Sequence, residues 1–281
     1  MSEFDIEGRT KTKPEEIAYS IKMQWDSPAF DGKTLLLVEF EADKRCYFKL
    51  FNHENVEIRT TAGCNVMKRL FDAIQPYGIP NFAIQDSDFA RVCGRIPAEA
   101  NYFVTDCHDH EMMCLKEDDV MKALFENLAL AYDSGLVATV FEDLRMLSYF
   151  KWYNYYYHLN VNFKGYKPRG KSKEDLCSFD AIYGAVLPQS PSCSSSIKES
   201  DVTTFVSSQT AFSAFEITNG HDFLDVFSQS IEEKYSIHGL NQERLQSIIY
   251  ASFTFERFVR TQLYHEILSW AGDRAPLLFA A

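Results

Sequence analysis

Short apolar runs alternate with amphipathic helical stretches in the first part of the chain. Residues 34–40 form a nearly continuous apolar run, which is typical of a strand buried on both faces of a parallel sheet. Further strands are predicted at residues 56–60, 80–85 and 102–105, and helices between them at residues 43–52 and 65–75. This alternation predicts an α/β fold with a small parallel sheet, flanked by helices and joined by right-handed crossovers.

Helical periodicity dominates the rest of the chain. Pro14 is a favourable first residue of a helix, and Ile17, Ile21 and Trp25 follow it at helical spacing. Beyond residue 115 we expect helices at residues 118–131, 137–157, 223–234, 241–251 and 255–270, with loops at residues 165–173 and 188–200. The predicted parts are an N-terminal tail and helix (1–30), an α/β domain (31–115) and a mainly helical C-terminal region packing on it (116–281).

The composition is that of a foldable globular protein. Hydrophobic residues make up 46% and charged residues 24% of the 281 residues, which excludes global disorder. No apolar run approaches the roughly 20 residues of a membrane-spanning helix, and residues 1–5 lack the pattern of a secretion signal. Seven cysteines without a Cys-x-x-Cys pair indicate reduced thiols, so we expect a cytoplasmic protein that does not engage a membrane.

Acidic residues directly follow three of the predicted strands. Glu39 follows the first strand, Asp86 and Asp88 follow the third, and residues 105–111 (TDCHDHE) follow the fourth. Ligands of open parallel sheets bind at the carboxyl ends of the strands, so we expect these carboxylates to converge. A hard divalent cation relieves their repulsion, and Mg²⁺, with Mn²⁺ as an alternative, prefers oxygen ligands of this kind. In an extended Asp-x-Asp segment both side chains point to one face, which favours a shared metal and phosphoryl-transfer chemistry.

Acidic residues after strands also serve as turn formers and helix caps. That alternative stays open for Asp43. Glu41 fits a solvated neighbour, and Asp118 and Asp119 fit helix caps. Because three strand ends are acidic together, the metal site remains the favoured interpretation.

The positions of these residues resemble a TOPRIM domain. Residues 38–43 (VEFEAD) stand where that family usually has Val-Glu-Gly-x-x-Asp, and residues 86–88 (DSD) stand at its Asp-x-Asp. One departure is Phe40, because a glycine is usual there and a larger residue would change the turn after Glu39. The chain is more specifically similar to the TOPRIM-like, OLD-related nuclease group of bacterial anti-phage systems. That similarity lies in residues 63–66 (GCNV), 105–113 (TDCHDHEMM) and 219–222 (NGHD).

This resemblance implies a Mg²⁺-dependent nuclease that is normally restrained. The group includes the toxin subunit of the PARIS anti-phage system, which is held by a partner ATPase and cuts tRNA when released. Carried over to this sequence, the catalytic residues are Glu39, Asp86, Asp88 and Glu111. Glu39 would be a metal ligand or general acid/base, Asp86 and Asp88 would hold metal, and Asp43 and Glu111 would complete a second metal site.

Other residues near the fourth strand leave alternatives open. Asp106 or His108 would orient phosphate or water near Glu111, and the pair His221 and Asp222 fits either a similar supporting role or a helix cap with a buried histidine. A zinc site made of Cys107, His108, His110 and Cys114 fits no common ligand spacing. The sequence contains no Gly-x-Ser-x-Gly elbow and no P-loop.

Basic residues gather in one stretch of an otherwise acidic chain. The net charge is −12, but the segment from Arg145 to Lys173 holds seven basic residues, nine aromatic residues and no acidic residue. Basic groups track phosphates and aromatic rings stack on unpaired bases, which suits a loop of RNA. Alternatively the rings are mainly core and the basic loop contacts phosphate or an acidic partner. The candidate nucleic-acid contacts are Lys151, Lys164, Lys167, Arg169, Lys171 and Lys173.

The sequence therefore predicts a metal-dependent nuclease toxin of anti-phage defence that cuts tRNA or another structured RNA and is restrained by a partner ATPase. The alternatives are a DNA nuclease of the OLD type and an inactive TOPRIM-like interaction module, which the Phe40 departure permits. A homodimer is also open, because nuclease sites often work in pairs on folded nucleic acid.

Overall fold

A computed structural model describes residues 13–193 and 196–280 of the chain. These residues divide into two compact units. Unit 1 contains the chain up to Asp86, the segment Ile96–Asp106 and the segment from Phe253 onward. Unit 2 contains Ser87–Arg95 and Cys107–Ser252. The units thus divide the chain differently from the boundaries at residues 30 and 115, and most of the expected tail at residues 1–13 lies outside the described residues.

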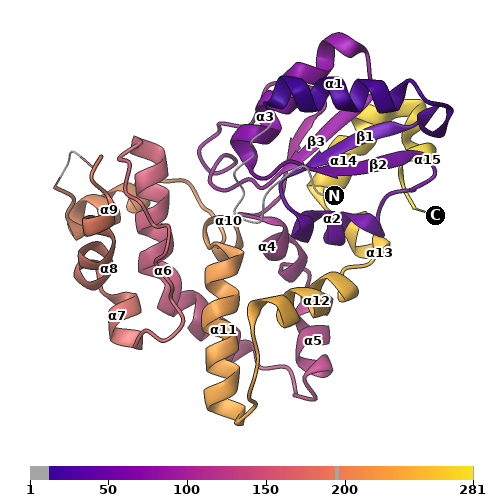
Figure 1. Ribbon diagram of the computed structural model, residues 1–281. Coiled ribbons are helices and arrows are strands. Elements are labelled where there is room, and N and C mark those ends of the chain that lie inside the picture. The colour runs from indigo at the N-terminus through magenta and orange to yellow at the C-terminus, as the bar shows by residue number, and fades with distance from the viewer. Residues whose placement is uncertain (1–12, 194–195, 281) are drawn as a thin grey trace. The chain divides into compact units, whose positions relative to one another are not determined.

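Unit 1 is built around a small sheet of four parallel strands, as the hydrophobic pattern predicts (Figure 1). The strands are β1 (Thr34–Val38), β2 (Val56–Thr60), β3 (Asn81–Gln85) and β4 (Tyr102–Val104). All five residues of β1 are buried, as expected for a central strand, whereas β2 buries only alternate residues because it lies at the edge. The prediction of an α/β fold is confirmed.

The strand order of this sheet is β2-β1-β3-β4. The chain leaves β1 through α2 (Glu41–Phe48) toward β2, and returns through α3 (Cys64–Ile74) to β3 on the other side of β1. The strand order therefore reverses between β1 and β3. In open α/β sheets this switch point opens a crevice at the carboxyl ends of the strands, where ligands bind.

Each face of the sheet has its own core. On one face Leu35, Leu37 and Ala83 pack with residues of α1 (Pro14–Trp25) and α3. On the other face Phe82 lies 5.3 Å, between ring centroids, from Trp270 of α14 (Gln262–Ala271). The C-terminal segment thus covers the second face of the sheet (Figure 1). It also contains α13 (Phe255–Phe258), η4 (Gly272–Arg274) and α15 (Ala275–Leu278).

The single helix expected at residues 255–270 is wrong, because the chain breaks it after Phe258. Thr261 is the N-cap of α14, and its Oγ1 accepts a hydrogen bond from the Tyr264 N–H at 3.1 Å. A new helix therefore starts at Gln262.

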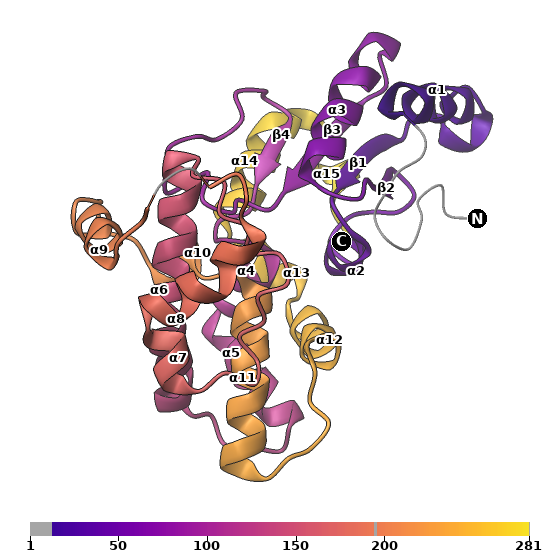
Figure 2. The same ribbon diagram turned by 60° about the vertical axis from the view of Figure 1, so that its left-hand side comes forward.

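Unit 2 is helical in the described residues, with α6 (Ser134–Tyr157) and α11 (Gly220–Tyr235) packed side by side (Figure 2). Its long helix α6 begins at a side-chain cap, where Asp133 Oδ1 accepts from the Leu136 N–H at 3.0 Å. The helices are α4 (His110–Leu115), α5 (Asp118–Asn127), α6 (Ser134–Tyr157), α7 (Lys173–Cys177), α8 (Phe179–Val186), η3 (Leu187–Gln189), α9 (Glu199–Ser207), α10 (Ala214–Ile217), α11 (Gly220–Tyr235) and α12 (Gln242–Ser252). The N-cap residue of α5 is Glu117, so Asp118 and Asp119 lie in its first turn and are not caps. No helix among the described residues is long and apolar enough to cross a membrane.

Candidate functional site

Two acidic residues of unit 1 meet at the switch point of the sheet. Glu39 follows β1 and Asp86 follows β3, the two strands between which the order reverses. The Asp86 N–H donates a hydrogen bond to Glu39 Oε1 at 3.3 Å, and the Glu39 side chain is buried. The structure therefore brings these two predicted residues together at the carboxyl edge.

Asp43 belongs to the same cluster and also stabilises the start of α2. Its Oδ2 accepts hydrogen bonds from the N–H groups of Glu39 and Phe40, at 3.0 and 2.9 Å. A buried carboxylate near a helix N-terminus satisfies N–H groups that have no partner within the helix. A carboxylate oxygen of Asp43 also lies within 4.8 Å of one of Asp86. Asp43 therefore caps α2 and also belongs to an acidic cluster with Glu39 and Asp86.

Phe40 does not distort the turn that follows Glu39. Its backbone is extended, with φ −134° and ψ 170°, so the position does not require glycine. Its ring is half exposed and therefore demands no space in the core. Glycine is needed instead at Gly63, the N-cap of α3, where φ is +113°.

The acidic cluster of unit 1 fits a hard cation. Asp43 and Asp86 offer carboxylate oxygens within 4.8 Å of each other, and Glu39 adds a carboxylate that is hydrogen-bonded to the Asp86 backbone. Oxygen ligands of this kind are those that Mg²⁺ and Mn²⁺ prefer. Burial and the negative charge of Glu39 both raise the pKa of the neighbouring Tyr102 phenol. The Tyr102 hydroxyl accordingly stays protonated and donates to Gln85 Oε1 at 2.6 Å.

Asp106, which follows β4, caps α14 of the same unit. Its Oδ2 accepts from the Gln262 N–H at 2.6 Å, and its Oδ1 accepts from the Leu263 N–H at 2.7 Å. Both carboxylate oxygens thus bind the N-terminus of a helix, which is a favourable place for a negative charge. This contact explains why an aspartate stands here without requiring a catalytic role.

Asp88 belongs to unit 2 and departs from the extended geometry expected for the Asp-x-Asp segment. Its φ is +46°, which places it in the left-handed region, so side-chain alternation does not carry over from Asp86. Its N–H donates to the His108 carbonyl oxygen at 2.6 Å. Burial raises the pKa of its carboxyl group, and the charges of His108 and Lys151 partly oppose this.

Glu111 is fully buried among helices of unit 2. Its Oε1 accepts hydrogen bonds from Gln246 Nε2 at 2.7 Å and from the Tyr250 hydroxyl at 2.9 Å, both on α12. His110 Nε2 lies 2.7 Å from the same hydroxyl. Glu111 Oε2 has no partner among the described residues. This carboxylate therefore connects α4 to α12, and no local pattern along the chain indicates either partner on α12.

Asp109 is the residue of this region that sequence reasoning missed. Its Oδ1 accepts from the Met112 N–H at 2.9 Å, which caps α4, and its Oδ2 accepts from the Gly220 N–H at 2.6 Å. His108 Nδ1 lies 3.2 Å from the same Oδ2. Burial raises the pKa of Asp109, but these hydrogen bonds outweigh it and hold the pKa below its usual value. An aspartate directly before a helix is the signal that indicates such a cap.

The Gly-His-Asp stretch has a steric explanation in the contact between α4 and α11. A Cβ at Gly220 would lie 2.5 Å from Asp109 Oδ1 and 2.7 Å from Glu111 Cβ, so glycine alone fits. The His221 side chain is 57% exposed, so the buried histidine considered from the sequence is wrong, although its Nε2 lies 3.7 Å from Glu111 Oε1. Asp222 forms an ion pair with Lys151, and the cap of α11 is Asn219.

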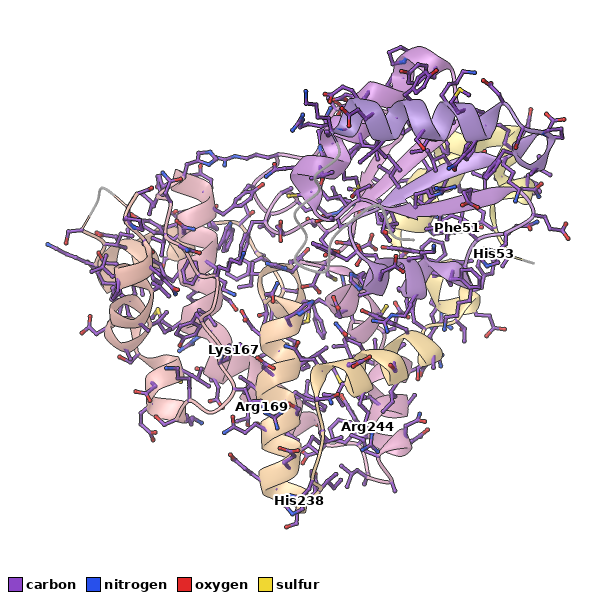
Figure 3. All side chains as sticks on the ribbon, viewed as in Figure 1. Phe51, His53, Lys167, Arg169, His238 and Arg244 are labelled. Carbon is purple, nitrogen blue, oxygen red and sulfur yellow. The ribbon has the colours of Figure 1, made fainter. Side chains whose placement is uncertain are left out.

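The basic stretch is partly neutralised by acidic residues from elsewhere in unit 2. Lys151 pairs with Asp222, and Lys173 lies 3.2 Å from Asp143. Arg169 Nη2 lies 2.6 Å from Glu232 Oε2 on α11. Lys167 also lies alongside α11 (Figure 3). Lys164 and Lys167 are exposed, and the Lys171 ammonium lies 5.6 Å from the centre of the Tyr166 ring. The positive surface is therefore smaller than the sequence suggests.

The four residues of the zinc alternative do not form a metal site among the described residues. His108 instead contacts Asp109, and His110 contacts Tyr250.

Comparison with known proteins adds no further constraint. No protein family, curated protein or solved structure matches the chain. The site is therefore interpreted from its own geometry.

Proposed function

We propose that the chain is a metal-dependent nuclease that acts as a toxin in bacterial anti-phage defence. The observation that carries the proposal is the meeting of Glu39 and Asp86 at the switch point of a parallel sheet, with an Asp43 oxygen within 4.8 Å of Asp86. The Glu39 and Asp43 carboxylates are buried beside Asp86. Neighbouring carboxylates repel one another unless something neutralises them, and a hard cation is the simplest partner.

The three carboxylates of unit 1 would hold the cation, which supplies stabilisation of negative charge on phosphate oxygens during phosphodiester hydrolysis. The chain's own contribution is to hold the carboxylates still. The N–H groups of Glu39 and Phe40 fix Asp43, and the Asp86 N–H fixes Glu39. The ligands are thus oriented before a substrate arrives, which reduces the reorganisation that catalysis requires.

Asp88 and Glu111 have a weaker claim to the metal. The resemblance to TOPRIM nucleases implies that both hold it, but Glu111 has a structural partner in α12 and Asp88 lies in a left-handed turn. We therefore assign Glu39, Asp43 and Asp86 as the proposed metal ligands.

RNA is the proposed substrate, with tRNA as the first example to test. The exposed Lys164 and Lys167 are the residues best placed to contact phosphate, because the other basic residues of the stretch are largely paired. The partner ATPase that restrains the toxin and the cytoplasmic location rest on the resemblance and on the cysteine pattern.

Expression in bacteria followed by RNA sequencing tests this proposal. The wild-type chain is compared with Glu39→Gln and Asp86→Asn, which remove charge with little change in shape. The matched control is Glu41→Gln, because Glu41 is exposed and contacts Thr60 at the surface.

We expect discrete cuts in tRNA with the wild type and with Glu41→Gln, and none with the other two variants. Cuts that persist in Glu39→Gln and Asp86→Asn refute the assigned site. Cuts in DNA and not in RNA favour the OLD-type alternative, and no cuts together with no Mg²⁺ binding favour the interaction module.

A further inference from the structure

A pocket of about 290 Å³ lies entirely within unit 2. Its walls include Asp88, His108, Lys151 of α6 and the rings of Phe89, Tyr155 and Phe163. The volume is at the small end of ligand sites, which suits a single base with its sugar better than a larger molecule. The pocket thus combines a few polar groups with flat apolar surfaces.

The polar side chains of this pocket include Asp88, His108, Lys151, Asn154 and Asn219. The Asn154 amide is bonded to the backbone of Val161, and Asn219 Oδ1 accepts from the Asp222 N–H. The Asp88 carboxylate is an acceptor when ionised. His108 Nδ1 lies 3.2 Å from Asp109 Oδ2, so Nδ1 donates to that carboxylate and Nε2 is the ring atom left for the pocket. His108 is buried, and its Nε2 has no partner among the described residues. The Lys151 ammonium is the donor, and its pairing with Asp222 leaves further N–H groups for a ligand.

The apolar walls suit a planar aromatic ligand. Phe163 and Tyr155 each contribute a half-buried ring, and the Lys151 ammonium lies 5.7 Å from the centre of the Phe163 ring. Phe89 packs edge-on against His108, with 4.8 Å between ring centroids, and thereby fixes the imidazole. Stacking on rings of this kind stabilises bound nucleobases by roughly 1–3 kcal/mol per base.

We infer that this pocket binds a guanine base. The Watson–Crick edge of guanine carries one acceptor, O6, beside two donor groups, N1–H and the 2-amino group. The Lys151 ammonium complements O6, and the two oxygens of the ionised Asp88 carboxylate complement the two donor groups. Adenine and cytosine each present one donor group beside a ring-nitrogen acceptor, and uracil presents one N–H between two carbonyl groups, so each leaves an acceptor of the pocket unpaired. A buried polar group without a partner is costly, and this cost gives the selectivity.

Guanine binding does not require cleavage, so the inference stands apart from the proposed function. If the chain cuts RNA, the bound base is an unpaired guanosine of the substrate, which is how proteins usually read RNA sequence.

Equilibrium binding of nucleoside monophosphates to the full chain in EDTA tests the inference. We expect GMP to bind at least tenfold more tightly than AMP, CMP or UMP, and IMP, which lacks the 2-amino group, to bind more weakly than GMP. Two further probes are a short single-stranded RNA with one guanosine and the DNA of the same sequence. If the RNA binds more tightly than GMP and the DNA, the natural ligand is a guanosine in RNA. If GMP binds as tightly as the RNA, the natural ligand is the free nucleotide.

Asp88→Asn is the decisive variant, because asparagine tolerates the left-handed φ of +46° and leaves the fold intact. We expect it to lose the guanine preference at least tenfold with an unchanged melting temperature. Phe163→Ala should weaken all four nucleotides, whereas Tyr157→Ala, at an exposed ring outside the pocket walls, should weaken none.

Equal affinities for the four nucleotides, or an unchanged preference in Asp88→Asn, overturn the inference. GMP binding that appears only with Mg²⁺ also overturns it, because Asp88 would then act through a metal. The variant Glu39→Gln separates this result from the proposed function: it should bind GMP normally even though cleavage is lost.

Discussion

Gly220→Ala offers a sharp test of the contact between α4 and α11 in unit 2. The added methyl group would lie 2.5 Å from Asp109 Oδ1 and 2.7 Å from Glu111 Cβ, both well inside contact distance. Overpacking of a well-packed site costs about 1–3 kcal/mol. Separating the helices also weakens the hydrogen bond from the Gly220 N–H to Asp109, which as a bond to a charged group contributes about 1.5–3 kcal/mol. The higher helix propensity of alanine returns about 1 kcal/mol.

The net expectation is a loss of about 3 kcal/mol in the free energy of unfolding. For a unit of about 150 residues this lowers the melting temperature by roughly 6–12 °C, measured by scanning calorimetry. The matched control is Gly184→Ala on α8, where nothing lies within 4 Å of the added methyl group. It should stabilise the protein by about 0.5–1 kcal/mol. A Gly220→Ala variant that melts within about 2 °C of wild type refutes the steric argument, because that shift corresponds to no more than about 1 kcal/mol.

The remaining predictions concern single contacts. The folded state holds the pKa of Asp109 below its ordinary value of 3.8. Its ionised form therefore stabilises the fold above pH 3.8, and this contribution is lost as the pH falls through the folded pKa. Denaturant titrations should show a smaller acid-induced loss of unfolding free energy in Asp109→Asn than in wild type. Asp106→Ala removes the two hydrogen bonds that Asp106 adds to the Thr261 cap of α14 and should cost about 1–2 kcal/mol by urea unfolding. Phe40→Gly should leave the RNA cleavage rate within about twofold and stability within about 1 kcal/mol, since the backbone there is extended and the ring half exposed; a large gain in activity would show that phenylalanine impairs the site.

The strands of unit 1 were predictable because their signal is local. A run such as β1 is apolar at every position only when both faces of the strand are buried, and residues 34–38 show this directly. The carboxylates at the carboxyl edge were predictable for the same reason, since strand ends can be located from the pattern. The cap by Asp43 also lies within one helical turn of its donors.

Contacts between distant segments were not predictable from local patterns. Asp106 caps a helix that begins 156 residues later, so nothing near residue 260 shows why the expected helix breaks there. The Lys151–Asp222 pair joins positions 71 apart, so a segment without acidic residues is still partly neutralised. The steric need for Gly220 likewise depends on Asp109, 111 residues away. These features depend on tertiary packing, which spacing along one chain does not encode.

The central claim is that the carboxylates at the switch point form a metal-dependent nuclease site. The most direct measurement is the initial rate of tRNA cleavage by the purified full chain, in Mg²⁺ and in EDTA, for wild type, Glu39→Gln and Glu41→Gln. We expect cleavage by wild type and Glu41→Gln in Mg²⁺, none in EDTA, and a rate reduced about 100-fold or more in Glu39→Gln. Cleavage that survives EDTA, or a Glu39→Gln variant as active as Glu41→Gln, would contradict it.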